Sequence, residues 1–162
     1  DCPRMTGIEP DQTRMFAEAA EAASVVARQL AANDDIVRGL AARFRAEGPR
    51  AVVTYARGSS DHAATFAKYV IETRVGVLTS SGAPSIASVY RDAPDGRDML
   101  ALAISQSGRS PDIPPAVEAA KGAGAVAVAL VNDEDTPLAA LSEANLVKGR
   151  RMESMRFSLP CS

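Results

Sequence analysis

The sequence has 162 residues and a mass of 16.9 kDa, with 46% hydrophobic residues and a formal net charge of −2. This is the size and composition of one globular domain. The near-neutral charge offers no basic stripe for nucleic acid, and no apolar run approaches the ~20 residues that cross a bilayer. Because Cys2 and Cys161 lie at opposite ends and His62 is the single histidine, we expect no metal and no other cofactor. We expect a cytoplasmic domain that binds neither nucleic acid nor membrane.

The N-terminal part of the sequence predicts two helices. Residues 1–12 form a polar leader that we expect to be disordered or of artificial origin. Apolar residues recur at three- or four-residue steps over 13–32, which predicts an amphipathic helix. Asn33 is a favourable N-cap, so we expect a second helix from Asn33 to the stop at Gly48.

From residue 51 onward, short apolar runs alternate with helical segments. The expected strands are Ala51–Ala56, Val75–Thr79, Met99–Ile104, Ala125–Val131 and Asn145–Val147. The expected helices between them are His62–Thr73, Ser85–Tyr90, Ala116–Gly122 and Thr136–Glu143. This alternation predicts the α/β class: a three-layer αβα sandwich around a five-stranded parallel sheet with right-handed crossovers. The domain should span 13–147, followed by an atypical tail over 148–162.

Two loops rich in serine and glycine follow the first and third expected strands. They read Gly58-Ser59-Ser60-Asp61 and Ser105-Gln106-Ser107-Gly108-Arg109-Ser110. In a parallel sheet both loops meet at the carboxyl edge, where hydroxyls and helix N-terminal amides form a cradle for an anion such as phosphate. The alternative is that these serines only cap helices and turns. Pro114 and Pro115 predict a late start for the helix after the second loop, which would weaken its N-terminal dipole there.

Other sites are excluded or disfavoured by the sequence. There is no Gly-Lys dipeptide for a Walker loop, no GxGxxG fingerprint opening a helix and no GxSxG elbow. His62 could serve as a general base, but packing or capping is the commoner role of a lone helical histidine. Glu72 and Glu118 fall near the far ends of their helices, and we expect them to face solvent.

Three segments resemble a known family. They are Ala56-Arg57-Gly58-Ser59-Ser60-Asp61-His62-Ala63, Ser81-Gly82-Ala83-Pro84-Ser85 and Ile104-Ser105-Gln106-Ser107-Gly108-Arg109-Ser110-Pro111-Asp112. They are similar to the first sugar isomerase (SIS) domain of the group that contains the isomerase half of glucosamine–fructose-6-phosphate aminotransferase and the glucosamine-6-phosphate deaminases. The resemblance runs from about Thr13 to Leu146, and it implies a flavodoxin-like sandwich that binds a phosphorylated hexose.

The resemblance also implies roles for individual residues. By matching position, Ser105, Ser107 and Ser110 would hold the phosphate. Gln106 and Ser60 would meet phosphate or sugar hydroxyls, and Ser59 would line the same loop. The expected ligands are hexose phosphates such as glucosamine 6-phosphate or fructose 6-phosphate.

The catalytic residues of this family are not matched in the sequence. Family members carry two SIS domains, and their catalytic Glu, His and Lys come from the second domain or a neighbouring subunit. The resemblance therefore implies one half of an aldose–ketose isomerase or deaminase, with a second SIS domain or a second copy as its partner. Two alternatives stay open: a non-catalytic phosphosugar sensor, and a single-domain isomerase whose sites are completed by oligomerisation.

Overall fold

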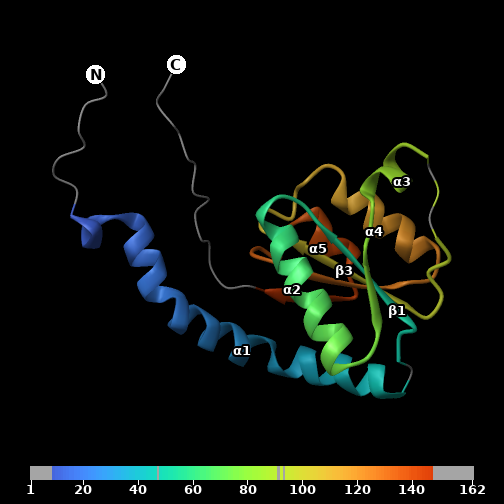
Figure 1. The fold of residues 1–162 in the computed structure, drawn as a ribbon, viewed down its shortest axis with the longest axis horizontal. Helices are drawn as coiled ribbons and strands as arrows, with labels where there is room; N and C mark the ends of the chain where they lie inside the picture. The colour runs from blue at the N-terminus through green and yellow to red at the C-terminus, as the bar shows by residue number, and fades with distance from the viewer. Residues whose placement is uncertain (1–8, 47, 91, 93, 148–162) are drawn as a thin grey trace.

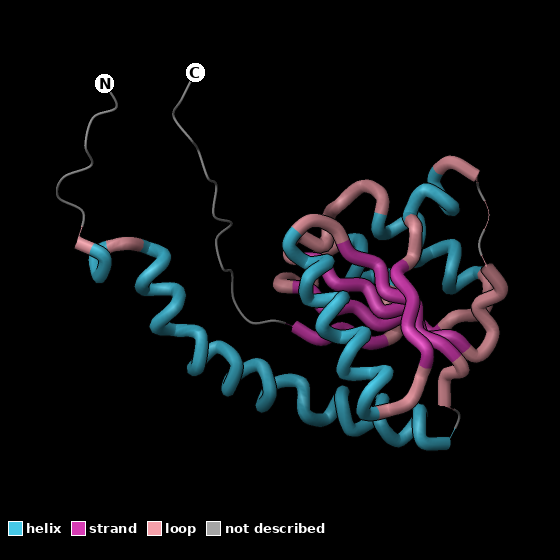
Figure 2. The backbone as a smooth tube through the Cα atoms, viewed as in Figure 1, coloured by secondary structure: helices cyan, strands magenta, loops and turns pink. Residues whose placement is uncertain are grey.

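A computed structural model of the chain describes residues 9–46, 48–90, 92 and 94–147, and the leader 1–8 and the tail 148–162 lie outside them. The helices are η1 (Pro10–Gln12), α1 (Arg14–Ala46), α2 (Ser59–Arg74), α3 (Pro84–Ser88), α4 (Ile113–Gly122) and α5 (Pro137–Leu141). The strands are β1 (Ala51–Ala56), β2 (Leu78–Ser81), β3 (Met99–Ser105), β4 (Val126–Val131) and β5 (Ala144–Val147). Strands and helices alternate from residue 51 onward (Figures 1 and 2), as the sequence predicts.

The five strands form one parallel sheet in the order β2-β1-β3-β4-β5. β1 pairs along its whole length with β3, from Ala51 opposite Met99 to Ala56 opposite Ile104. This strand order is that of the flavodoxin-like folds, and its switch point lies between β1 and β3. The predicted fold class is therefore confirmed, and the two serine-rich loops leave the sheet from adjacent strands.

The main core lies between the sheet and the layer formed by α3, α4 and α5, in which α4 packs against both of the other helices. Alternate residues of β3 and β4 face this layer. They are fully buried and mostly alanine: Ala101, Ala103, Ala127, Ala129 and Val131. Their small side chains let α4 pack closely on the sheet through Ile113 and Val117. α2 packs instead on β1, β2 and β3 from the opposite side, which completes the three layers (Figure 2).

The N-terminal part of the chain forms one helix of 33 residues, so the prediction of two helices divided at Asn33 is wrong. Asn33 does not cap a new helix, because its Nδ2 donates to the carbonyl of Gln29 one turn earlier at 2.9 Å and the side chain stays within the continuous helix. The first half of α1 extends away from the sheet (Figure 1), and Met15 and Leu30 are 56% and 69% exposed. The second half packs near β5, where Arg43 Nη1 lies 2.7 Å from Glu143 Oε2. None of the helices in the described part of the chain is long and apolar enough to cross a membrane.

Several element boundaries differ from the sequence prediction. α2 begins at Ser59, three residues before the predicted His62, so Ser59 and Ser60 are its first helical residues. Two further differences have clear local causes. β2 begins at Leu78 and not at Val75, because Val75 keeps a helical conformation as the C-cap of α2 and Gly76 turns the chain with a φ of 75°. α4 begins at Ile113 and not near Ala116. Pro114 and Pro115 occupy its first turn, where amide groups make no intrahelical hydrogen bond, so neither proline interrupts the helix.

Candidate functional site

The carboxyl ends of β1 and β3 bring the two serine-rich loops to one edge of the sheet. Ser59 and Ser60 begin α2 directly after β1, and Ser105 is the last residue of β3. Gln106, Ser107 and Ser110 follow in the loop that leads to α4. The sequence-predicted residues therefore share one edge. Ser105 is buried, Ser60 and Ser110 are half-buried, and Ser59, Gln106 and Ser107 are exposed.

Two of these serines accept hydrogen bonds from their own loop. Ser105 Oγ accepts from the amide of Gly108 at 3.1 Å, and Ser107 Oγ accepts from the amide of Arg109 at 3.2 Å. A hydroxyl that accepts such a bond still has its own proton to donate. The local capping role and the donation of a hydrogen bond to an anion are therefore compatible in the same side chain.

The β3–α4 loop is fixed from the opposite side by the segment between β4 and α5. Gly108 adopts a φ of 62°, and a Cβ placed on it would lie 2.5 Å from Thr136 Oγ1. Arg109 Nη2 donates to the carbonyl of Asp135 at 2.8 Å, and the amide of Leu138 donates to the carbonyl of Gly108 at 3.4 Å. These contacts hold the loop in one conformation before any ligand arrives.

The β1–α2 loop has fewer restraints. Gly58 is the N-cap of α2 with a φ of 57°, so no side chain caps the helix, and a Cβ there would meet nothing within 4 Å. The amides of Ser60 and Asp61 donate to the carbonyls of Arg57 and Gly58 at 3.2 and 3.1 Å. The loop is a tight turn with open space beside it.

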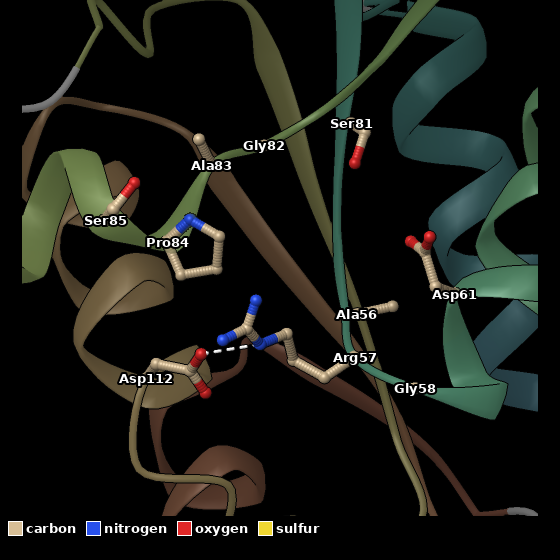
Figure 3. A pocket seen from close by; sticks show the side chains of 10 residues that line it. All are labelled: Ala56, Arg57, Gly58, Asp61, Ser81, Gly82, Ala83, Pro84, Ser85 and Asp112. Atoms are coloured by element: carbon tan, nitrogen blue, oxygen red, sulfur yellow. Dashed lines mark ion pairs between the residues drawn. The ribbon is translucent and has the colours of Figure 1, made fainter.

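A pocket of about 580 Å³ opens at this edge of the sheet (Figure 3). Its lining comes from the loop after β1, the loop after β2 and the start of α4: Ala56, Arg57, Gly58, Asp61, Ser81, Gly82, Ala83, Pro84, Ser85 and Asp112. None of the predicted serines, nor Gln106, lines it, although Ser59 directly follows Gly58 and Ser110 lies two residues before Asp112. The pocket therefore borders the serine-rich loops. None of its lining residues was predicted as a site residue, although all ten lie within the three segments that carry the family resemblance.

The glycine of the β2–α3 loop shapes the pocket wall. A Cβ on Gly82 would clash with the ring of Tyr55, so this position requires a residue without a side chain. Tyr55 is 5% exposed, and its burial raises the pKa of the phenol. The ring is therefore a neutral, fixed support beneath the loop.

An ion pair joins two of the lining elements. Arg57 Nε lies 2.7 Å from Asp112 Oδ2, and the arginine side chain is 63% exposed while the aspartate is 24% exposed (Figure 3). Asp61 brings a second carboxylate to the same pocket from the first turn of α2. Within this lining Arg57 is the single cation.

The other acid–base candidates lie elsewhere. His62 is exposed and does not line the pocket, and Glu118 is exposed as expected. The expectation that Glu72 faces solvent is wrong: it is half-buried, and its Oε1 accepts from the amide of Thr79 at 3.0 Å, which fixes the start of β2 on α2. In the described part of the chain, no three His, Cys, Asp or Glu residues gather in a metal-binding cluster.

Comparisons with known proteins agree with this architecture. A crystal structure from Silicibacter pomeroyi, named as a candidate phosphosugar isomerase, is 41% identical with a TM-score of 0.81 and matches 83% of this chain and 41% of its own. The C-terminal domain of glucosamine-fructose-6-phosphate aminotransferase from Francisella tularensis is 22% identical with a TM-score of 0.69, over 87% of this chain and 41% of that one. The NanR protein of Vibrio vulnificus, solved in complex with ManNAc-6P, is 20% identical with a TM-score of 0.62, over 86% of this chain and 53% of that one.

The chain spans about two fifths of the length of the first two of these structures, 41% in each case. A comparison with curated protein sequences gives no significant match. The family model of the SIS domain matches residues 48–160, which include the whole sheet and both serine-rich loops. The chain belongs to the SIS domain family.

Proposed function

We propose that this chain is the phosphosugar-binding SIS domain of an aldose–ketose isomerase or a glucosamine-6-phosphate deaminase that acts on hexose 6-phosphates. The observation that carries the proposal is the convergence of the loops after β1, β2 and β3 on one pocket at the carboxyl edge of the sheet. In open α/β sheets, ligands bind at this edge beside the switch point.

The proposed phosphate site is the serine-rich edge of the pocket. The hydroxyls of Ser105, Ser107 and Ser110 donate to the phosphate, and Ser59, Ser60 and Gln106 meet phosphate or sugar hydroxyls. The fixed conformation of the β3–α4 loop supports this assignment, because donors that are already in place cost little entropy when they bind. The sugar then extends toward the hydroxyls of Ser81 and Ser85 in the pocket.

The test is a calorimetric titration with glucosamine 6-phosphate and fructose 6-phosphate, with glucosamine and fructose as matched ligands that lack the phosphate. We expect the phosphorylated sugars to bind and the free sugars to bind too weakly for detection. Equal affinity for a sugar and its phosphate would contradict the proposal.

A turnover assay on the same sample separates an enzyme from a sensor. Several relatives are named as phosphosugar isomerases, whereas NanR was solved with a bound phosphosugar. Conversion of the bound sugar phosphate supports the catalytic alternative, including a single domain completed by oligomerisation. Binding without conversion supports the sensing alternative or a domain that requires a second SIS domain.

We also propose that a second copy of the chain or a second SIS domain covers the exposed first half of α1. Met15, Val26 and Leu30 are more than half exposed there, and on the α2 side of the sheet Leu102 and Leu130 are only half-buried.

Sedimentation of the chain should show self-association that Leu30→Glu weakens. The control Ala31→Glu places the same charge on the neighbouring side of the helix and should have little effect. A stable monomer whose α1 is nevertheless protected from hydrogen exchange would contradict this.

A further inference from the structure

The start of α4 has an unusual distribution of hydrogen-bond donors. Asp112 is the N-cap residue, and a capping aspartate ordinarily accepts from the amide of the second or third helical residue. Those positions are Pro114 and Pro115, which have no amide proton, and the Asp112 side chain makes no capping hydrogen bond. The carboxylate instead pairs with Arg57 Nε at 2.7 Å.

The same two prolines remove donors that an anion would use. A helix N-terminus binds phosphate through its unpaired amides, and α4 lacks two of them in its first turn. The hydroxyls of Ser105 and Ser107 offer hydrogen bonds but no net charge. Asp61 and Asp112 bring negative charge to the adjoining pocket. A cation from another element would balance the charge of a dianionic phosphate at this edge.

Arg57 is placed to supply that cation. It leaves the sheet at the end of β1, immediately before Gly58 and Ser59 of the proposed phosphate site. Asp112 contacts the guanidinium of Arg57 through Nε, the nitrogen nearest the aliphatic part of the side chain. The Arg57 side chain remains 63% exposed. Figure 3 shows the guanidinium lying between Pro84 and the start of α4, inside the pocket lining. The neighbouring Arg109 instead donates to the carbonyl of Asp135.

We propose that Arg57 is the charged anchor for the phosphate of the ligand and that Asp112, freed from helix capping by Pro114 and Pro115, is the positioning residue that orients it. The terminal nitrogens of the guanidinium bind two phosphate oxygens, while Nε stays on Asp112. The inference rests on the proposed function, since it takes a phosphosugar as the ligand.

The test compares the affinity of variants of this 162-residue chain for fructose 6-phosphate by calorimetry. Arg57→Met keeps the length of the side chain and removes its charge, and we expect the Kd to rise at least 10-fold. Arg57→Lys restores a charge without the planar fork and should fall between wild type and Arg57→Met. The dependence of the Kd on ionic strength should weaken in Arg57→Met, which a purely structural role would not produce.

Asp112→Asn tests the positioning role. We expect it to raise the Kd by about 3- to 10-fold in the wild-type background and to have no effect in the Arg57→Met background, because Asp112 acts through the arginine. Arg38→Met is a matched control: Arg38 Nε pairs with Asp34 Oδ2 at 2.8 Å on the exposed surface of α1. This control should leave the Kd unchanged.

The outcomes separate the inference from the proposed function. If wild type binds fructose 6-phosphate and Arg57→Met binds it equally well, the role of Arg57 is overturned while the function stands. If wild type binds no hexose phosphate, both are overturned. Thermal melting of each variant without ligand shows whether it is folded. If Arg57→Met unfolds, the Kd of Arg57→Lys is compared with that of wild type instead.

Discussion

The two serine-rich loops occupy equivalent positions after neighbouring strands, yet the structure holds them in different ways. The β3–α4 loop is tied to itself through Ser105 and Ser107 and to the next loop through Gly108 and Arg109. The β1–α2 loop has a glycine N-cap with open space beside it, and the ion pair of the exposed Arg57 with the half-buried Asp112 links it to the start of α4.

This difference shows that similar composition does not mean similar rigidity. The β3–α4 loop is restrained by contacts to itself and to the neighbouring loop, whereas fewer contacts restrain the β1–α2 loop. With fewer contacts to break, the β1–α2 loop can adjust to a ligand more readily than the β3–α4 loop.

The largest effect should come from adding a methyl group to the rigid loop. Gly108→Ala places a Cβ 2.5 Å from Thr136 Oγ1 at a left-handed φ, and we expect a loss of about 3 kcal/mol in the free energy of unfolding. Gly58→Ala is the matched control, since its φ of 57° is similar and nothing lies within 4 Å. It should cost about 1 kcal/mol from backbone strain alone. If urea denaturation shows that both variants lose the same free energy of unfolding, the two loops are equally restrained.

A smaller effect is expected from the buried serine. Ser105→Ala removes the acceptor of the Gly108 amide in a buried position, which should lower the free energy of unfolding by about 1–3 kcal/mol. If Ser105 also donates to phosphate, calorimetry should show weaker hexose phosphate binding at a temperature where the variant is folded. Unchanged affinity in that sample would mean that Ser105 only stabilises the loop.

The smallest effect on stability should come from the exposed serine. Ser107→Ala leaves the Arg109 amide open to water, so the free energy of unfolding should change by less than about 0.5 kcal/mol. The affinity for hexose phosphate should nevertheless fall by about 1.5–3 kcal/mol, because one charge-assisted hydrogen bond is lost. A variant with wild-type affinity would show that Ser107 is a turn residue and not a ligand contact.

Hydrophobic patterning predicted the sheet well because its strands are short apolar runs with clear ends. The bounds of β1 are those predicted, and β3 differs by one residue. The errors arose where side chains satisfy the backbone in a way that composition does not show. Asn33 bonds back along its own helix, and Val75 looks like a strand residue but closes α2 before the turn at Gly76.

The sequence predicted that the two serine-rich loops share one edge of the sheet, and a pocket opens beside them, but none of its lining residues was among the predicted site residues. Arg57 and Asp112 are far apart in the sequence, and neither belongs to a motif that indicates an ion pair. One signal was present: an aspartate followed at the second and third positions by prolines cannot cap its helix and therefore needs another partner. The β2–α3 loop lies in the resembling segment 81–85, but its contribution to the pocket wall depends on the packing of Gly82 against Tyr55, which the sequence does not show.

The position of β1 between β2 and β3 has a consequence for the order of folding. β1 can pair with β2 soon after the ribosome has made both strands, but its other edge pairs with β3, where Ala51 lies opposite Met99. Closing that long loop is slow relative to local contacts, and the apolar edge of β1 stays unpaired in the meantime. Such edges are where nascent chains aggregate. β1, which leads into one of the two serine-rich loops, is thus also a segment exposed to misassembly while the chain is being synthesised.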